Sequence, residues 1–220
     1  MLPPKADPEP APLDPGDAVI MFAGRGNGYT SYFWFSSFRY LMHETDRLLI
    51  EDISPAHAGE MFNGLQDSRA YKFIPDDPPR HFTALRERYR KLSANKISPD
   101  GREEWLNWVL RLKDGGSLIG FIQATINVGD RESLVAYQLF PAFWGKGYAQ
   151  ESLEWLVQEL FHNRSVNVLV ALIDTRNTNS IRLVEKIGFT MEKITKDSDY
   201  FKGRTSDEFR FILRREKFSL

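Results

Sequence analysis

The stretch PAFWGKGYAQES, residues 141–152, places two glycines and a lysine between an apolar run and a helical pattern. Glycine reaches backbone conformations that other residues avoid, so two glycines at a strand-to-helix junction indicate a special turn. Three interpretations are open at this point: capture of a phosphate group, a plain turn into a helix, and close packing of the backbone. The rest of the sequence has to distinguish between them.

The composition is that of a soluble globular protein without a strong electrostatic bias. The chain has 220 residues, of which 42% are hydrophobic and 27% charged, and its formal net charge is -1. This balance gives no support for a nucleic acid or an anionic membrane as partner. With no cysteine and four scattered histidines, we expect no disulfide, no cysteine nucleophile and no metal site. No apolar run reaches the roughly 20 residues of a membrane span and no secretory pattern is visible, so we expect a cytoplasmic protein.

Residues 1–41 differ in composition from the rest and are predicted to be an extension. Six of the twelve prolines lie within the first fifteen residues, which favours disorder there. Residues 18–41 are rich in aromatic residues and glycine. This segment is either weakly ordered, or docks on the domain or a partner chain, or precedes a natural start at Met42. The folded domain is predicted to span residues 42–220.

Residues 42–220 carry alternating strand and helix patterns. Strands are predicted over 47–53, on both sides of the turn Asp114-Gly115-Gly116, over 133–140 and 166–173, and as a final antiparallel pair. Helices are predicted from an N-cap at Ser54 to about 65, over 79–94, from Gly147 to about 162, and up to a glycine cap at Gly188. The order is β-α-α-β-β-β-α-β-α-β-β, which indicates a mixed sheet with helices on its faces.

Residues Gly145 to Ala149 have the physical properties of an anion site. The first N–H groups of a helix lack intrahelical partners and carry the positive end of the helix dipole. Glycines in front of a helix let the backbone close around a phosphate, and Lys146 adds a cation. A Walker-type loop is disfavoured because Gly147 and Tyr148 follow the lysine, where that motif needs serine or threonine.

A second motif, DTRNTNSIRLVEKIGF at 174–189, follows the apolar run 166–173 and opens the last helix. Together with LFPAFWGKGYAQES at 139–152, it resembles the GNAT superfamily of acetyl-CoA-dependent N-acyltransferases. The opening TDRLLIEDISPAHAGEMF at 45–62 is similar to the RimJ/RimL-like branch, the ribosomal-protein N-terminal acetyltransferases. The resemblance covers about residues 42–218. It implies an α+β fold in three layers, with a mixed, mostly antiparallel central sheet between helices, and acetyl-CoA as co-substrate.

The resemblance also implies which residues hold the coenzyme. The family's phosphate motif falls on residues 144–149, with Trp144 in place of the usual glutamine or arginine. The diphosphate of coenzyme A would be held by the backbone amides of Gly145, Lys146, Gly147, Tyr148 and Ala149. Leu139 and Phe140 would offer main-chain hydrogen bonds to the pantetheine arm. Asn177 would contact the same arm, although a residue that starts a turn or helix explains its position equally well.

The catalytic acid of the family is often a tyrosine in the last helix, and Val184 occupies that place here. The branch offers a serine instead, which corresponds to Ser180. A serine at this position is equally well explained as a residue of the helix N-terminus. The acid would supply a proton to the leaving thiolate.

No single residue is indicated as the base that removes the proton of the amine. The branch often has a glutamate near the start of the central strand, where this chain has Leu134; Glu132 lies two residues earlier and is the candidate. Glu103, Glu104 and Asp207 are alternatives, and removal of the proton through water needs none of them.

The main hypothesis is an N-acetyltransferase that joins an amine and acetyl-CoA directly in a ternary complex. Its acceptor would be a peptide or a small molecule with a primary amine, and the protein would be a monomer or a homodimer. A non-catalytic acyl-CoA-binding module is the alternative, since the usual tyrosine is missing. A third hypothesis is an interaction module built around the aromatic segment 18–41.

Overall fold

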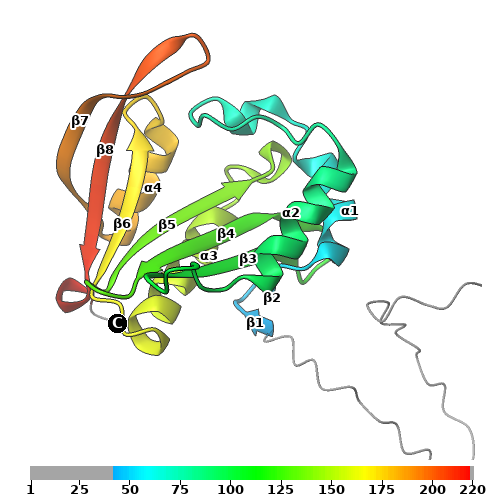
Figure 1. Ribbon diagram of the computed structural model, residues 1–220, viewed down its shortest axis with the longest axis horizontal. Helices are drawn as coiled ribbons and strands as arrows, with labels where there is room; N and C mark the ends of the chain where they lie inside the picture. The colour runs from blue at the N-terminus through cyan, green and yellow to red at the C-terminus, as the bar shows by residue number, and fades with distance from the viewer. Residues whose placement is uncertain (1–41, 219–220) are drawn as a thin grey trace, which may run out of the picture. The chain divides into compact units, whose positions relative to one another are not determined.

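The computed structural model describes residues 42–218, so the predicted extension 1–41 lies outside the described residues (Figure 1). The strands and helices alternate along the chain broadly as the sequence predicts. In chain order they are β1 (Met42–Glu44), β2 (Leu48–Asp52), α1 (Ala58–Gly64), α2 (Phe82–Ala94), β3 (Glu103–Leu112), β4 (Leu118–Asn127), β5 (Glu132–Leu139), α3 (Tyr148–Gln158), β6 (Val168–Asp174), α4 (Thr178–Ile187), β7 (Thr190–Phe201) and β8 (Arg204–Arg214).

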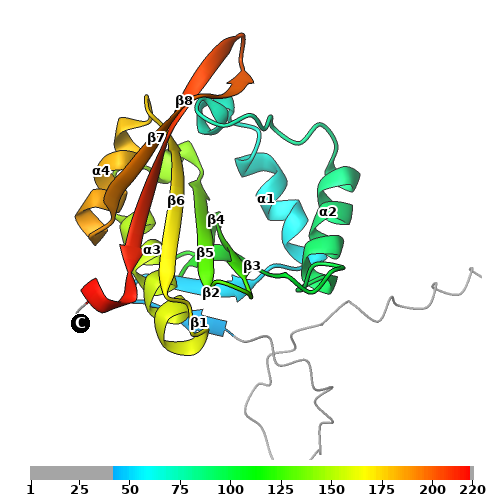
Figure 2. The same cartoon turned by 60° about the vertical axis from the view of Figure 1, so that its left-hand side comes forward.

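All eight strands of the described chain form one sheet, in the order β1-β2-β3-β4-β5-β6-β8-β7. Neighbouring strands are antiparallel except β5 and β6, which run parallel. Helices α1 and α2 pack on one face of the sheet, and α3 and α4 on the other (Figures 1 and 2). The predicted α+β fold with a mostly antiparallel sheet between two helical layers is therefore confirmed.

Strand β3 shows how the sequence pattern produces these layers. Leu106, Trp108 and Leu110 are almost fully buried in the larger core beneath α3, as their alternation predicts. Val109, which points to the opposite face, is buried in a smaller core with Leu85 and Tyr89 of α2. Each such side chain contributes roughly 1.5–3 kcal/mol when it leaves water, so the alternation fixes which face each helix covers.

The helix ends are also where the sequence places them. Ser54 precedes Pro55 as the N-cap of a short 3-10 turn that leads into α1, and its backbone N–H bonds to Nδ1 of His57. Gly188 closes α4 in the left-handed conformation, with φ of 105°. The helix predicted from Gly147 to about residue 162 is α3 followed by one π-helical turn, Glu159–Asn163.

Two features of the sheet differ from the prediction. A short extra strand, β1, pairs with β2. The final hairpin, for which the sequence predicts strands over 189–194 and 207–213, is longer and has its turn at residues 202–203. The hairpin strands are stabilised by pairing rather than by burial: every residue of β7 before Phe201 is exposed. Sequence patterns based on burial therefore miss most of its length.

The sheet is split between β5 and β6. These strands pair only over Glu132–Leu134 with Val168–Val170 and then separate toward their carboxyl ends. Beside the split, β4 and β5 approach closely at Gly120, where an added Cβ would lie 2.2 Å from the backbone oxygen of Gln138. The split leaves the β6-facing backbone of the second half of β5 without a strand partner.

Candidate active site

The glycine loop in front of α3 presents a row of free backbone donors. Gly145 and Gly147 adopt left-handed conformations, with φ of 73° and 84°, and Gly147 is the N-cap of α3. The first amide that finds an acceptor is that of Glu151, which bonds to the carbonyl of Gly147 at 3.1 Å. Within residues 42–218, the N–H groups of 145–150 have no hydrogen-bond acceptor. Such a row at a helix start suits a diphosphate.

An ion pair from the first strand region holds the loop in place. Arg47 Nε lies 2.6 Å from Glu151 Oε2, its Nη1 donates to the carbonyl of Lys146 at 2.9 Å, and its guanidinium covers the ring of Tyr148. Burial raises the pKa of Glu151, but hydrogen bonds from Thr45 and Arg47 outweigh this effect and lower it. The carboxylate in the first turn is therefore neutralised, and it repels an anion at the loop less.

The glycine loop opens into a cavity of about 760 Å³, the coenzyme cavity, lined by residues from 69–74, 137–150 and 177–183. Two of its cations, Lys72 and Arg182, have no carboxylate within ion-pair distance among the described residues. The cavity brings together most of the residues expected to hold the coenzyme or supply the acid: Leu139, Trp144, Gly145, Gly147, Tyr148, Ala149, Asn177 and Ser180. Lys146 and Phe140 do not line it.

The end of β5 provides main-chain groups, but not all of those predicted. Phe140 donates its N–H to Ile119 of β4 at 2.8 Å, and its buried ring lies against Gly64 in the smaller core. Backbone groups alternate along an antiparallel strand, so those of Tyr137 and Leu139 point toward the split. The carbonyl of Leu139 accepts from Trp144 Nε1 at 2.8 Å, which gives the tryptophan a structural role.

Asn177 caps α4 and also lines the coenzyme cavity. Its Oδ1 accepts from the backbone N–H of Ser180 at 3.3 Å, so the predicted role at a helix start is the one described. Next to it, Asp174 fixes the turn by accepting from Arg176 and Ser206. Burial raises the pKa of Asp174, but these bonds outweigh it and lower the pKa to about 2.

A tyrosine for which the sequence predicts no role, Tyr137, lies beside Ser180. The hydroxyl of Tyr137 is buried and, within residues 42–218, meets no partner at hydrogen-bond geometry. Burial raises the pKa of this hydroxyl, an effect that the neighbouring Ser180 side chain partly offsets. A neutral phenol without a partner is a competent proton donor. Alternation along β5 places Tyr137 on the buried face of the strand. Only the fold shows how deeply its hydroxyl is buried and that Ser180 lies beside it.

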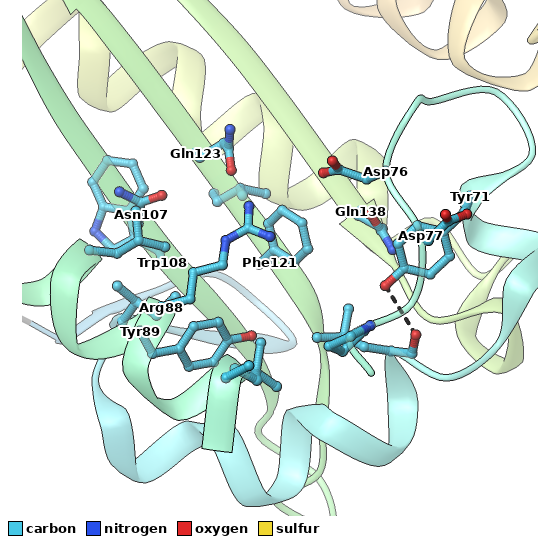
Figure 3. A pocket seen from close by; sticks show the side chains of 17 residues that line it. Tyr71, Asp76, Asp77, Arg88, Tyr89, Asn107, Trp108, Phe121, Gln123 and Gln138 are labelled. Carbon is cyan, nitrogen blue, oxygen red and sulfur yellow. Dashed lines mark hydrogen bonds between the residues drawn. The ribbon is translucent and has the colours of Figure 1, made fainter. Parts of the chain in front are cut away.

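A second cavity of about 170 Å³, the α2 cavity, lies between α2, the loop 76–79 and strands β3 to β5 (Figure 3). Its polar lining includes Asp76, Arg88, Asn107, Gln123 and Gln138. Gln138 lines both cavities, so the two adjoin at this residue, next to the split between β5 and β6.

The carboxylates considered as bases are not at this junction. Glu132 lies at the paired end of β5, where it accepts from Arg210 Nη2 at 2.6 Å, and it lines neither cavity. The alternatives are equally engaged elsewhere: Glu103 with the Trp105 indole, Glu104 with Arg164, and Asp207 with Lys196.

No group of three histidine, aspartate or glutamate side chains in residues 42–218 is arranged to hold a metal ion. No helix of this part of the chain is long and apolar enough to cross a bilayer.

Comparison with known proteins identifies the class to which this fold and site belong. Residues 47–190 match the family model described as acetyltransferase (GNAT) domain. The chain therefore belongs to the GNAT family of acetyltransferases and is an acyltransferase.

Individual relatives have low sequence identity to this chain, but the matches extend over nearly the whole length of each relative. The chain is 24% identical over 178 residues to an uncharacterized N-acetyltransferase, p20, of Bacillus licheniformis, covering 80% of this chain and 97% of the relative. A spermidine N-acetyltransferase of Vibrio cholerae, solved with CoA and spermine, superposes with a TM-score of 0.68 at 20% identity, covering 79% of this chain and 98% of that one. RimL, a ribosomal L7/L12 alpha-N-protein acetyltransferase, superposes with a TM-score of 0.67 at 15% identity, covering 77% and 91%.

Proposed function

We propose that this protein transfers the acetyl group of acetyl-CoA to a primary amine by direct attack in a ternary complex. The observation that carries the proposal is the meeting of two cavities at Gln138, beside the split in the sheet. One cavity ends in the free amides of 145–150, which suit the diphosphate of coenzyme A. The other cavity gives an amine a separate approach to the thioester.

The pantetheine arm would lie along the split and bond to the free N–H of Leu139 and to the backbone of Tyr137, much as a missing strand would. This places the thioester near Gln138 and the Tyr137 hydroxyl. The amine nitrogen forms a bond to the thioester carbon, and the bond from that carbon to sulfur breaks. Tyr137 donates its proton to the departing thiolate, with the Ser180 side chain beside it, and solvent takes the proton of the amine.

The acceptor is a primary amine on a small molecule or at the N-terminus of a peptide. The two solved relatives are a spermidine N-acetyltransferase and a ribosomal L7/L12 alpha-N-protein acetyltransferase, so the fold alone does not choose between these two kinds of acceptor. The opening 45–62 and the serine at position 180 favour kinship with the RimJ/RimL-like branch.

Two measurements on the full chain test this function. Calorimetric titration should give micromolar binding of acetyl-CoA, and mass spectrometry should detect acetylated products among small amines and peptides. Absence of acetyl-CoA binding would overturn the proposal. Tight binding without turnover over the whole panel would instead identify a module that senses acyl-CoA.

A further inference from the structure

The lining of the α2 cavity carries information about the acceptor. Its volume, about 170 Å³, is below the roughly 300–1,000 Å³ of pockets for drug-sized ligands. The cavity therefore suits a small acceptor or one end of a larger one. What it recognises must follow from the polar groups that line it.

Three carboxamides line the sheet side of the cavity. Asn107 and Gln123 are directly opposite each other on β3 and β4, and Gln138 follows on β5, opposite Phe121. The Asn107 and Gln123 side chains make no hydrogen bond within residues 42–218, and Nε2 of Gln138 is buried without a partner. Each carboxamide both donates and accepts, and buried amides left unpaired are costly. The row is therefore suited to a ligand with several hydrogen-bonding groups.

Arg88 supplies a positive charge that nothing in the described chain neutralises. Its side chain extends from α2 into the cavity, toward the strands that carry Asn107 and Gln123 (Figure 3). No carboxylate of residues 42–218 lies within 4.0 Å of it, although Glu87 pairs with both Arg90 and Lys91 on the same helix. A planar guanidinium of this kind binds a carboxylate through two parallel hydrogen bonds.

A negative charge faces the other part of the cavity. Asp77 is bonded to Lys202, whereas the carboxylate of Asp76 has no bonded cation among the described residues. Figure 3 shows Asp76 near Gln138, on the side of the cavity away from Asn107. An ammonium group held there lies next to the junction with the coenzyme cavity, where the reaction would take place.

We infer that the acceptor is a primary amine that also carries a carboxylate, such as an amino acid or a short peptide. The inference rests on the proposed function and names its substrate class. Arg88 binds the carboxylate, the row of carboxamides bonds to the polar groups between the two ends, and Asp76 attracts the amine toward Gln138. A polyamine fits this cavity less well, because it would place an ammonium group near Arg88.

The experiment compares L-amino acids and dipeptides, each with its C-terminal carboxamide, and spermidine as a polyamine. The free acid should react with a kcat/KM about 10- to 100-fold above that of its amide, because a charge-assisted hydrogen bond is lost in the amide. Arg88→Gln should bring the ratio of acid to amide close to one. Arg86→Gln, on the same helix but outside the cavity, should leave the ratio unchanged.

Binding measurements separate this inference from the proposed function. Saturation-transfer NMR of the acids and amides requires no turnover, and acetyl-CoA titration of Arg88→Gln should match wild type, because Arg88 does not line the coenzyme cavity. Equal binding and turnover of acid and amide, or preference for spermidine, would overturn the inference while leaving acetyl transfer intact. Loss of acetyl-CoA binding in wild type would overturn the function instead.

Discussion

Lys202, at the turn of the β7–β8 hairpin, donates from Nζ to the backbone carbonyl of Asp76 at 2.9 Å, although 126 residues of sequence separate them. The same ammonium also bonds to the carboxylate of Asp77. The hairpin thereby holds the loop that carries two acidic residues of the α2 cavity (Figure 2). A contact between a hairpin turn and a loop beside a cavity is well placed to control how that cavity binds its ligand.

Lys202→Met should weaken binding of the acceptor without affecting the coenzyme. With the loop released, we expect KM for the amine to rise about 3- to 10-fold, as ordering the loop on binding then costs free energy. The Kd of acetyl-CoA should stay within twofold of wild type. Steady-state kinetics and titration check both quantities. Lys193→Met, on the same hairpin but without an ion pair in the described chain, is the control. A matching rise in that variant would contradict the specific role of Lys202.

Gly145→Ala should weaken acetyl-CoA binding by at least tenfold. The left-handed backbone at Gly145 costs alanine roughly 1 kcal/mol, and the added methyl group enters space that no described atom fills, where the diphosphate is proposed to lie. Gly115→Ala is a matched control, because Gly115 has φ of 76° and also meets nothing within 4 Å. Both variants should lose similar thermal stability. Similar loss of acetyl-CoA affinity in both would show that strain, rather than the phosphate site, is responsible.

Tyr137→Phe should lower kcat by about 10²-fold or more, because general acids typically contribute 10²–10⁴. KM for acetyl-CoA should change little, since the backbone of β5 remains in place. Ser180→Ala should have a smaller effect, as the serine only adjoins the phenol. If Ser180→Ala abolished turnover while Tyr137→Phe left it unchanged, the serine itself would be the acid.

The stability of the protein should fall in acid through Asp174. Its pKa is lowered from the usual 3.8 to about 2, so the ionised carboxylate stabilises the fold above pH 4, and this contribution is lost as the pH falls from 4 to 2. The shift corresponds to about 2 kcal/mol. Urea unfolding of wild type and Asp174→Asn at pH 6 and pH 2.5 measures it. The difference between the two proteins should be largest at pH 6. An equal difference at both pH values would show that the charge contributes nothing.

Elements that depend on local pattern were predictable from the sequence. The alternation of Leu106, Trp108 and Leu110 fixes the faces of β3, and Gly188 and Ser54 mark helix ends through backbone geometry that few residues adopt. The glycine loop was also predictable from local sequence, because the first N–H groups of a helix lack intrahelical acceptors in any fold. Binding of the coenzyme through these groups stays a prediction.

Features that depend on distant residues were not predictable in the same way. Arg47 and Glu151 are 104 residues apart in the sequence, and the residues around each of them do not predict that the two form an ion pair. From the sequence, Glu132 was a candidate base because no neighbouring residue indicates an ion-pair partner for it. In the fold, β8 places Arg210 beside it. In the sequence Tyr137 and Gln138 are ordinary strand residues, and only the fold shows that each has a buried side-chain polar atom without a partner.

The split between β5 and β6 also has a consequence for protein dynamics. Amide hydrogens of paired strands exchange slowly with deuterated solvent, whereas the β6-facing amides of Tyr137 and Leu139 have no strand to protect them. They should exchange early in the free protein, in the midst of a sheet that otherwise exchanges late. A ligand lying in the split would slow these two positions, so deuterium uptake at β5 would give a residue-level signal of occupancy that needs neither turnover nor a label.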